Sequence, residues 1–222
     1  MKFVCPYINN VFDTECGSIN SLVIENQDLF VRLLKDIYSQ MNGDDGVSVV
    51  SSNDKILDLS KNVEVIDSFV DFEINKKNLI SKIVTKIESI ANSETFISDS
   101  YKLLSNIESY LNDISFELTG DIFFSNIGIL SIIKACSPVI RDEYDSIAEK
   151  VIDYFELVSE YDRKKLFITV NMRSFVSDSE VQLFVDTVLS HEYNVIMVEN
   201  REYNKLLKEN RFIVDSELCE IK

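Results

Sequence analysis

The C-terminal part of the chain alternates short apolar runs with an amphipathic stretch, and this order constrains the fold more than any other feature. Residues 166–170 (Leu-Phe-Ile-Thr-Val) and 195–198 (Val-Ile-Met-Val) are continuous apolar runs, typical of strands that are buried on both faces. Between them, Ser177 or Asp178 begins a stretch whose apolar residues have helical spacing. Strand, helix and strand joined by short connections predict parallel pairing in an α/β sheet.

The rest of this pattern involves both ends of the chain. A helix is expected at about 202–209, followed by a last strand at 212–214. Near the N-terminus, Asn26 is expected to cap a helix that runs to about residue 40, with apolar residues on one face. Further strands are expected at residues 22–24, 47–50 and 63–66. The fold class predicted is therefore α/β, with a head built from both chain ends.

The middle of the chain has a different character. Between about residues 75 and 160, apolar residues recur at helical spacing in three stretches, of which the first contains Leu79, Ile83, Ile87 and Ile90. We therefore predict a head domain of residues 1–74 and 161–222, with residues 75–160 as an inserted α-helical leg.

The charge and cysteine content exclude several classes of protein. The 222 residues carry 22 Lys and Arg against 38 Asp and Glu, a net charge of −16, so a polyanion must be met by a local basic region. Four scattered cysteines and one histidine indicate reduced thiols rather than a zinc site. The N-terminus does not resemble a signal peptide, and the apolar run 127–133 is too short to span a membrane. We expect a cytoplasmic protein.

Motifs for nucleotide binding or catalysis are not found. The five glycines form neither Gly-x-x-x-x-Gly-Lys nor Gly-x-Gly-x-x-Gly, and Asn171 follows the strand at 166–170 where a hydrolase would place a magnesium-binding Asp. His191, at the end of a predicted helix, suits the helix dipole as an exposed side chain. We therefore expect no enzymatic activity and no bound nucleotide.

The basic residues are few and unevenly distributed. Lys76, Lys77, Lys82 and Lys86 lie in a stretch without any acid, residues 163–165 (Arg-Lys-Lys) lie where the predicted leg re-enters the head, and Arg201, Lys205, Lys208 and Arg211 form a third cluster. One interpretation is that they are solvated faces of an acidic protein. The other is that the first two clusters flank the ends of one insertion and form a site for a phosphate backbone, with little sequence preference.

Six segments, in order along nearly the whole chain, resemble the Csn2 family of accessory proteins from type II-A CRISPR systems. They are residues 22–26 (Leu-Val-Ile-Glu-Asn) leading into Phe30, Ile37 and Tyr38; 43–46 (Gly-Asp-Asp-Gly); 56–61 (Ile-Leu-Asp-Leu-Ser-Lys); 164–171 (Lys-Lys-Leu-Phe-Ile-Thr-Val-Asn); 177–181 (Ser-Asp-Ser-Glu-Val); and 194–199 (Asn-Val-Ile-Met-Val-Glu).

The resemblance implies a P-loop-like parallel-sheet head without functional nucleotide motifs and an inserted helical leg. It also implies a non-catalytic homotetrameric ring that encircles double-stranded DNA, entered from free ends. Such proteins support spacer acquisition in antiviral defence, together with the CRISPR integrase and the effector nuclease. By this resemblance, the first candidates to line the hole are Lys76, Lys77, Lys82, Lys86, Lys164 and Lys165. The second candidates are Lys134 and Arg141.

Calcium is the point at which the sequence departs from the family. Similar proteins bind Ca²⁺ through an acid-rich hinge, and the matching stretch here is residues 117–126. Glu117 and Asp121 remain, and Glu25 is a further candidate ligand, but neutral and apolar residues stand where the family usually has more carboxylates. Because Ca²⁺ takes six to eight oxygens, these residues need additional donors. The first alternative function left open is a protein-interaction scaffold of the adaptation complex with little DNA binding of its own. The second is a degenerate NTPase or metal nuclease, for which Asp121 and Glu199 are the residues to change.

Overall fold

The structure is a computed structural model that describes residues 1–15, 17–125 and 127–221. The chain divides into two compact units. Unit 1 is Met1–Glu73 together with Glu143–Lys222, and unit 2 is Ile74–Asp142. Of the four cysteines that we expect to be reduced, Cys16 lies outside the described residues, and Cys5, Cys136 and Cys219 are free thiols.

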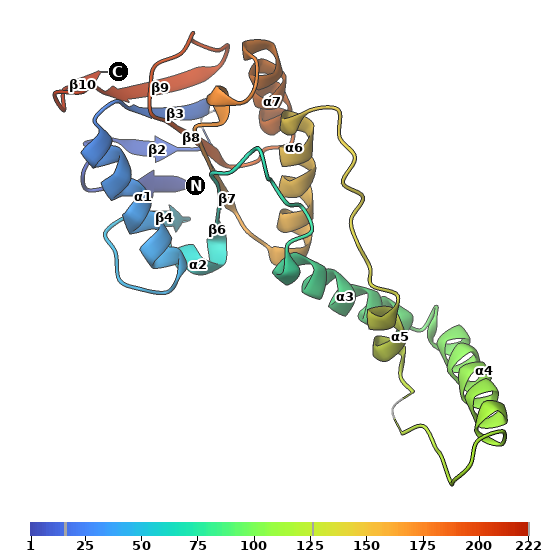
Figure 1. The fold of residues 1–222 in the computed structure, drawn as a ribbon. Helices are drawn as coiled ribbons and strands as arrows, with labels where there is room; N and C mark the ends of the chain where they lie inside the picture. The colour runs from blue at the N-terminus through green and yellow to red at the C-terminus, as the bar shows by residue number, and fades with distance from the viewer. Residues whose placement is uncertain (16, 126, 222) are drawn as a thin grey trace. The chain divides into compact units, whose positions relative to one another are not determined.

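Unit 1 contains a six-stranded, mostly parallel sheet (Figure 1). Five strands run parallel, and only the short edge strand β10 is antiparallel to its neighbour. In spatial order the strands are β10 (Glu220–Ile221), β9 (Glu209–Val214), β3 (Ile19–Ile24), β8 (Val195–Glu199), β7 (Leu166–Val170) and β6 (Val63–Ile66). The α/β class is confirmed with a mostly parallel sheet, whereas the strand expected at 47–50 is β4 (Val49–Ser52) of a separate antiparallel sheet.

The sheet is buried on both faces because its strands alternate their apolar side chains between two cores. One core contains Leu22, Ile168 and Ile196 of the strands, together with Leu33 and Ile37 of α1 (Gln27–Met41). It also takes up apolar residues of a second, antiparallel sheet with the strand order β2 (Val11–Asp13), β1 (Lys2–Val4), β4 (Val49–Ser52) and β5 (Lys55–Leu57). A short helix α2 (Leu59–Asn62) precedes β6.

The opposite face is covered by α6 (Ile147–Leu157) and α7 (Asp178–Ser190). Phe155 of α6 stacks on Phe167 of β7 with 4.0 Å between ring centroids, and Phe184 of α7 meets Phe155 edge-on. The Tyr154 hydroxyl donates a hydrogen bond of 2.6 Å to the Glu64 carboxylate of β6. Two short helical turns, the π-helix η1 (Val158–Asp162) and the 3₁₀-helix η2 (Met172–Ser174), flank β7.

The helix ends were predicted well because their signals are local. The Asn26 side chain accepts a hydrogen bond from the Leu29 backbone N–H at 3.0 Å, and Ser177 and Glu180 form a reciprocal capping box at the start of α7.

The helix predicted at 202–209 is wrong, because side chains from elsewhere hold the backbone of this segment. Arg173 and Arg211 donate to the carbonyls of Asn204 and Tyr203, respectively, and Gln182 accepts from the Leu207 N–H. The backbone groups that a helix would pair internally are therefore already satisfied.

The described residues of unit 2 form the helices α3 (Lys77–Ala91), α4 (Ile97–Ser115) and α5 (Ile129–Ala135). Helix α3 contacts α5 and buries Leu79 and Val84. At the base of the unit the Asn75 side chain donates to the Ile140 carbonyl at 2.9 Å and accepts from the Ile140 N–H at 2.7 Å. These two hydrogen bonds hold the two ends of the unit together.

Candidate nucleic-acid interface

The lysines of α3 are placed against the local preference of a helix. Lys76 is the N-cap residue and makes no side-chain cap hydrogen bond, Lys77 is the first helical residue, and the first turn contains no acid. Cations at a helix N-terminus cost about 0.3–1 kcal/mol each. Lys82 and Lys86 follow one turn apart, and both are exposed. The stability of the helix does not explain this arrangement.

Unit 2 brings two more of the predicted basic residues to α3. Lys134 lies in the last turn of α5, which packs against α3. Arg141 follows Ile140, and Lys76 follows Asn75, so the Asn75–Ile140 hydrogen bonds bring the backbone at Arg141 close to the backbone at Lys76. We call these six residues the basic set of unit 2: Lys76, Lys77, Lys82, Lys86, Lys134 and Arg141.

Charge is segregated within unit 2. Residues 74–87 contain four lysines and no acid, whereas residues 88–121 contain seven acids and a single lysine, Lys102. Lys102 is itself 3.0 Å from the Asp99 carboxylate. The whole unit has seven basic and eight acidic residues, a net charge of −1, so the remaining −15 of the chain belongs to unit 1. A polyanion would meet its weakest long-range repulsion at unit 2.

The predicted residues Lys164 and Lys165 belong to unit 1. The Lys164 ammonium donates to the Ser60 carbonyl, so this side chain has a structural role. The Lys165 backbone bonds to Asn62, and its side chain is exposed. That these two lysines share one surface with the basic set of unit 2 stays a prediction.

The third basic cluster is not a stripe on a helix. The Arg211 side chain is 8% exposed and pairs with Glu209 at 2.7 Å and with Glu202 at 3.1 Å. Arg201 lies over the Tyr203 ring, 4.8 Å from its centroid. Because their charges are engaged within unit 1, these arginines contribute little to an anion-binding surface.

The sequence does not reveal that a charged group is buried at the carboxyl edge of the sheet. Glu199 ends β8 and is 1% exposed. One of its oxygens accepts from the Arg173 N–H at 3.2 Å, and the other has no hydrogen-bond partner in the described part of the chain. Burial raises the pKa of Glu199 to about 7. The signal in the sequence was an acid immediately after an apolar strand.

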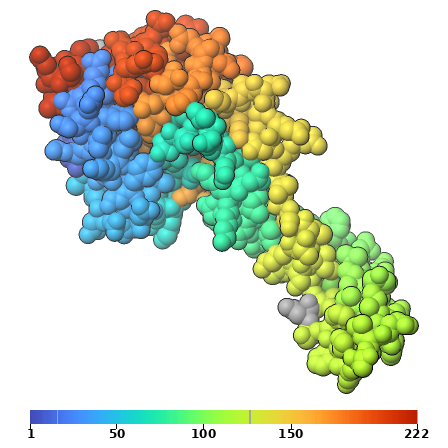
Figure 2. All heavy atoms as spheres, in the orientation of Figure 1, coloured from blue at the N-terminus to red at the C-terminus, as the bar shows by residue number. Residues whose placement is uncertain are grey.

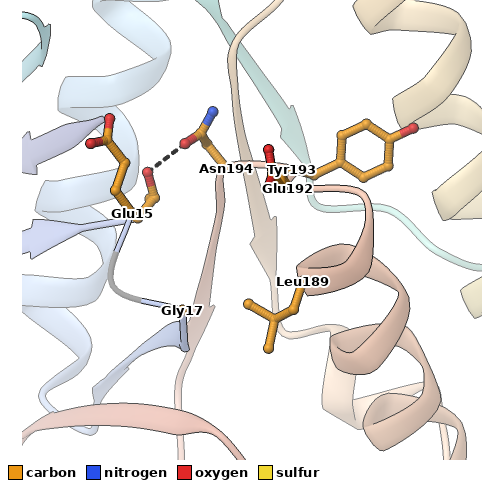
Figure 3. Close-up of a pocket in the computed structure, with 7 residues that line it drawn as sticks. Glu15, Gly17, Leu189, Glu192, Tyr193 and Asn194 are labelled. Carbon is orange, nitrogen blue, oxygen red and sulfur yellow. Dashed lines mark hydrogen bonds between the residues drawn. The ribbon is translucent and has the colours of Figure 1, made fainter.

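At the opposite end of β8 there is a pocket of about 400 Å³. Figure 3 shows Leu189, Glu192, Tyr193 and Asn194 along it, and the Thr14 hydroxyl donates to the Asn194 side-chain oxygen at 2.6 Å. Glu15, which also lines it, is 2.7 Å from the N-terminal amine. None of the described residues that line the pocket is basic, so it does not suit a phosphate or a nucleotide.

The candidate calcium ligands do not form a complete site. Glu25 belongs to unit 1, and Glu117 and Asp121 are exposed residues of unit 2 beyond the end of α4. No group of three or more His, Cys, Asp or Glu residues that could hold a metal ion exists among the described residues. Two carboxylates fall short of the six to eight oxygens that Ca²⁺ takes. Asn126, at the end of the hinge stretch, lies outside the described residues.

No helix in residues 1–15, 17–125 and 127–221 combines the length and the apolar character needed to cross a bilayer. The fold and the charge distribution thus define a class: a mixed α/β protein with a separate helical unit in which basic residues gather on one helix.

Comparison with known proteins identifies the family. The family model described as CRISPR-associated protein (Cas_Csn2) matches residues 40–218. The CRISPR-associated protein Csn2 of Enterococcus faecalis is 24% identical over 199 residues, which cover 86% of this chain and 89% of that protein. That of Streptococcus agalactiae is 21% identical over 197 residues, which cover 88% of this chain and 87% of that protein. The chain belongs to the Csn2 family of type II-A CRISPR adaptation, whose members are generally non-catalytic accessory proteins.

Proposed function

We propose that this member of the spacer-acquisition machinery binds double-stranded DNA without sequence specificity, through the basic set of unit 2. The four lysines at the start and along α3 carry the proposal, because no acid lies among them and because Lys76 and Lys77 stand where helix stability disfavours cations. Lysines without interleaved aromatic side chains suit phosphate contacts rather than base contacts. Lys165 would extend the same surface.

A homotetrameric ring that threads onto DNA ends would explain how so acidic a chain can bind a polyanion. One protomer offers few phosphate contacts within a net charge of −16, whereas four copies that face one hole would multiply them. Release of counterions makes such binding steeply salt-dependent, with a slope of about −0.9 per phosphate contacted. The CRISPR integrase and the effector nuclease would be the protein partners at this step.

The proposed head is a P-loop-like fold that has lost nucleotide binding. The parallel strands, numbered along the chain, lie in the spatial order fifth, first, fourth, third, second, so the first strand, β3, has a parallel strand on each side. Only Glu25 and Asn26 join β3 to α1. A phosphate-cradling loop needs several glycines at this place, and Glu25 would repel a phosphate. No nucleotide is therefore expected to bind.

The test compares linear duplex DNA with covalently closed circular duplex of the same length. A length of about 400 base pairs lets the circle close without severe bending, since the persistence length is about 150 base pairs. Binding to the linear form alone, at two salt concentrations, supports a closed ring that threads onto ends. Equal binding to both forms contradicts threading and indicates a lateral DNA surface.

Failure to bind either form would favour the alternative, a protein-interaction scaffold. Helix α4 is the observation that supports this alternative, because none of its 19 residues is buried and Tyr101 and Tyr110 are each 66% exposed. Exposed aromatic residues of this kind are enriched in protein interfaces.

A further inference from the structure

Helices α6 and α7 of unit 1 form a groove that the proposed DNA-binding function does not use. The two helices contact each other and lie side by side at the surface, yellow and orange in Figure 2. The groove has a volume of about 360 Å³, room for two or three side chains. Its apolar lining comes from Ala148 and Ile152 of α6 and from Leu183 and Phe184 of α7. Leu183 is 66% exposed.

Carboxylates from both helices line the same groove. Glu149 and Asp153 lie one turn apart on α6, and Glu180 lies on α7. Glu149 suits the first turn of α6, where its carboxylate accepts from the Asp145 N–H at 3.2 Å. Asp153, four residues further along, adds a like charge that destabilises the helix, so the stability of α6 does not explain this second carboxylate. Within the described part of the chain neither of them forms an ion pair.

The two helices are strongly acidic as a whole. Together they carry six acids and one base, Lys150, and the Lys150 ammonium lies over the Phe72 ring, 5.8 Å from its centroid. Unit 1 as a whole has a net charge of −15. This charge repels DNA and disfavours a second copy of the same chain, and it attracts a basic polypeptide.

We propose that the α6–α7 groove docks an amphipathic helical segment of a partner protein, with apolar residues flanked by lysines or arginines. The apolar side chains would enter between Ile152 and Leu183, at the i and i+3 or i+4 spacing of a helix laid in a groove. The flanking cations would meet Glu149, Asp153 and Glu180. This surface is distinct from the basic set of unit 2, and it gives the chain a separate contact for a protein.

The test uses a fluorescently labelled 14-residue peptide, Leu-Lys-Lys-Leu-Leu-Lys-Leu-Leu-Lys-Lys-Leu-Leu-Lys-Leu, whose anisotropy reports binding to the full-length chain at physiological salt. The rim variant Glu149→Lys/Asp153→Lys should weaken binding about fivefold to tenfold, as expected for two partly exposed charge pairs. Leu183→Ser should weaken it by a similar factor, because it removes apolar contact area.

The matched control is Asp45→Lys/Glu217→Lys, which changes the net charge by the same amount at exposed positions outside both helices. Its affinity for the peptide should stay within twofold of that of the unaltered chain. Equal weakening by the control and rim variants would overturn the proposal, because binding would then follow net charge alone. Absence of peptide binding to the unaltered chain would overturn it as well.

Two further measurements separate the remaining outcomes. Hydrogen exchange with bound peptide should slow in α6 and α7, and slowing confined to other elements would contradict the site. Sedimentation equilibrium of the rim variant should match that of the control variant. A smaller assembly in the rim variant alone would identify a second copy as the occupant and would overturn the proposal of a basic partner.

Discussion

Unit 1 buries even charged side chains, whereas unit 2 exposes even aromatic ones. Glu64, Arg173, Glu199 and Glu209 are all less than 9% exposed in unit 1. In unit 2, Phe123 is 77% exposed and α4 has no buried residue. Burying a charge costs several kcal/mol unless it is paired, so unit 1 must have enough apolar burial to offset that cost. Unit 2 lacks such burial, and its chemistry is available to other molecules.

The contrast between the two units predicts that the largest loss of stability comes from a substitution in the aromatic core of unit 1. Phe155→Ala removes a ring that stacks on Phe167 at 4.0 Å and contacts Phe184. Loss of a buried phenyl ring costs about 3–5 kcal/mol. Tyr101→Ala on α4 should cost less than about 0.5 kcal/mol. Urea unfolding measures both, and similar losses would show that α4 is packed in solution.

The next effect concerns the buried carboxyl of Glu199. Its pKa of about 7 in the folded chain lies above its ordinary value of 4.5, so the folded state holds a proton that the unfolded chain has released. The stability from this group is complete below pH 4.5 and is lost as the pH rises to about 7. This pKa shift corresponds to a change of at most about 3 kcal/mol in the free energy of unfolding.

The variant Glu199→Gln should therefore gain stability relative to the unaltered chain as the pH rises from 4.5 to 7. Glu209→Gln is the opposing control, because Arg211 and the Leu206 N–H hold the pKa of Glu209 below its usual value despite burial. This second variant should lose stability relative to the unaltered chain as the pH rises through the low-pH range, where Glu209 ionises. Denaturant titrations at several pH values measure the free energy of unfolding of each variant. If the difference between Glu199→Gln and the unaltered chain does not change with pH, the raised pKa of Glu199 is contradicted.

A smaller effect should distinguish the basic set of unit 2 from the basic residues of unit 1. Lys82→Glu/Lys86→Glu should weaken binding to linear duplex DNA about thirtyfold, or about 2 kcal/mol. The salt slope should become shallower by nearly one for each phosphate that the variant no longer neutralises. Lys205→Glu/Lys208→Glu has the same charge change and should lower the affinity less than threefold. Gel shifts at several salt concentrations measure both, and equal weakening by the two variants would indicate general electrostatics.

The smallest effect should come from calcium. Because Glu117 and Asp121 supply only two carboxylates, millimolar Ca²⁺ should raise the midpoint of thermal unfolding by less than about 2 °C. Chelator should likewise leave the affinity for linear DNA unchanged. A large stabilisation that disappears in Asp121→Asn would establish a calcium site in which Asp121 is joined by donors beyond Glu117.

The sequence predicts those parts of the fold whose signals lie close together along the chain. The buried runs of β3, β6, β7 and β8 were recognised, as were the caps of α1 and α7. The three-residue strands β1, β2 and β5 were not, because so short a strand gives no usable alternation. The helix predicted at about 202–209 is wrong, since the backbone partners Arg173 and Gln182 come from distant segments.

The candidate site likewise has features that can be predicted from the sequence and features that cannot. The acid-free run that contains Lys76 to Lys86 is visible in the sequence, and so is its position at a helix N-terminus. The proximity of Lys76 and Arg141 is not, because it depends on a pair of hydrogen bonds between residues separated by 65 positions. Arg211 shows the converse, since charge pattern alone cannot separate an exposed arginine from one paired with a buried glutamate.

The hydrogen bonds between Asn75 and Ile140 also bear on how this chain can vary in evolution. They close unit 2 into a loop whose two ends are fixed to each other. The entropy cost of closing a loop rises only by about 0.6 kcal/mol for each doubling of its length. Insertions and deletions between residues 75 and 140 can therefore accumulate at little cost in the free energy of folding. Lineages can lengthen, shorten or replace the helices while the sheet domain keeps its sequence constraints.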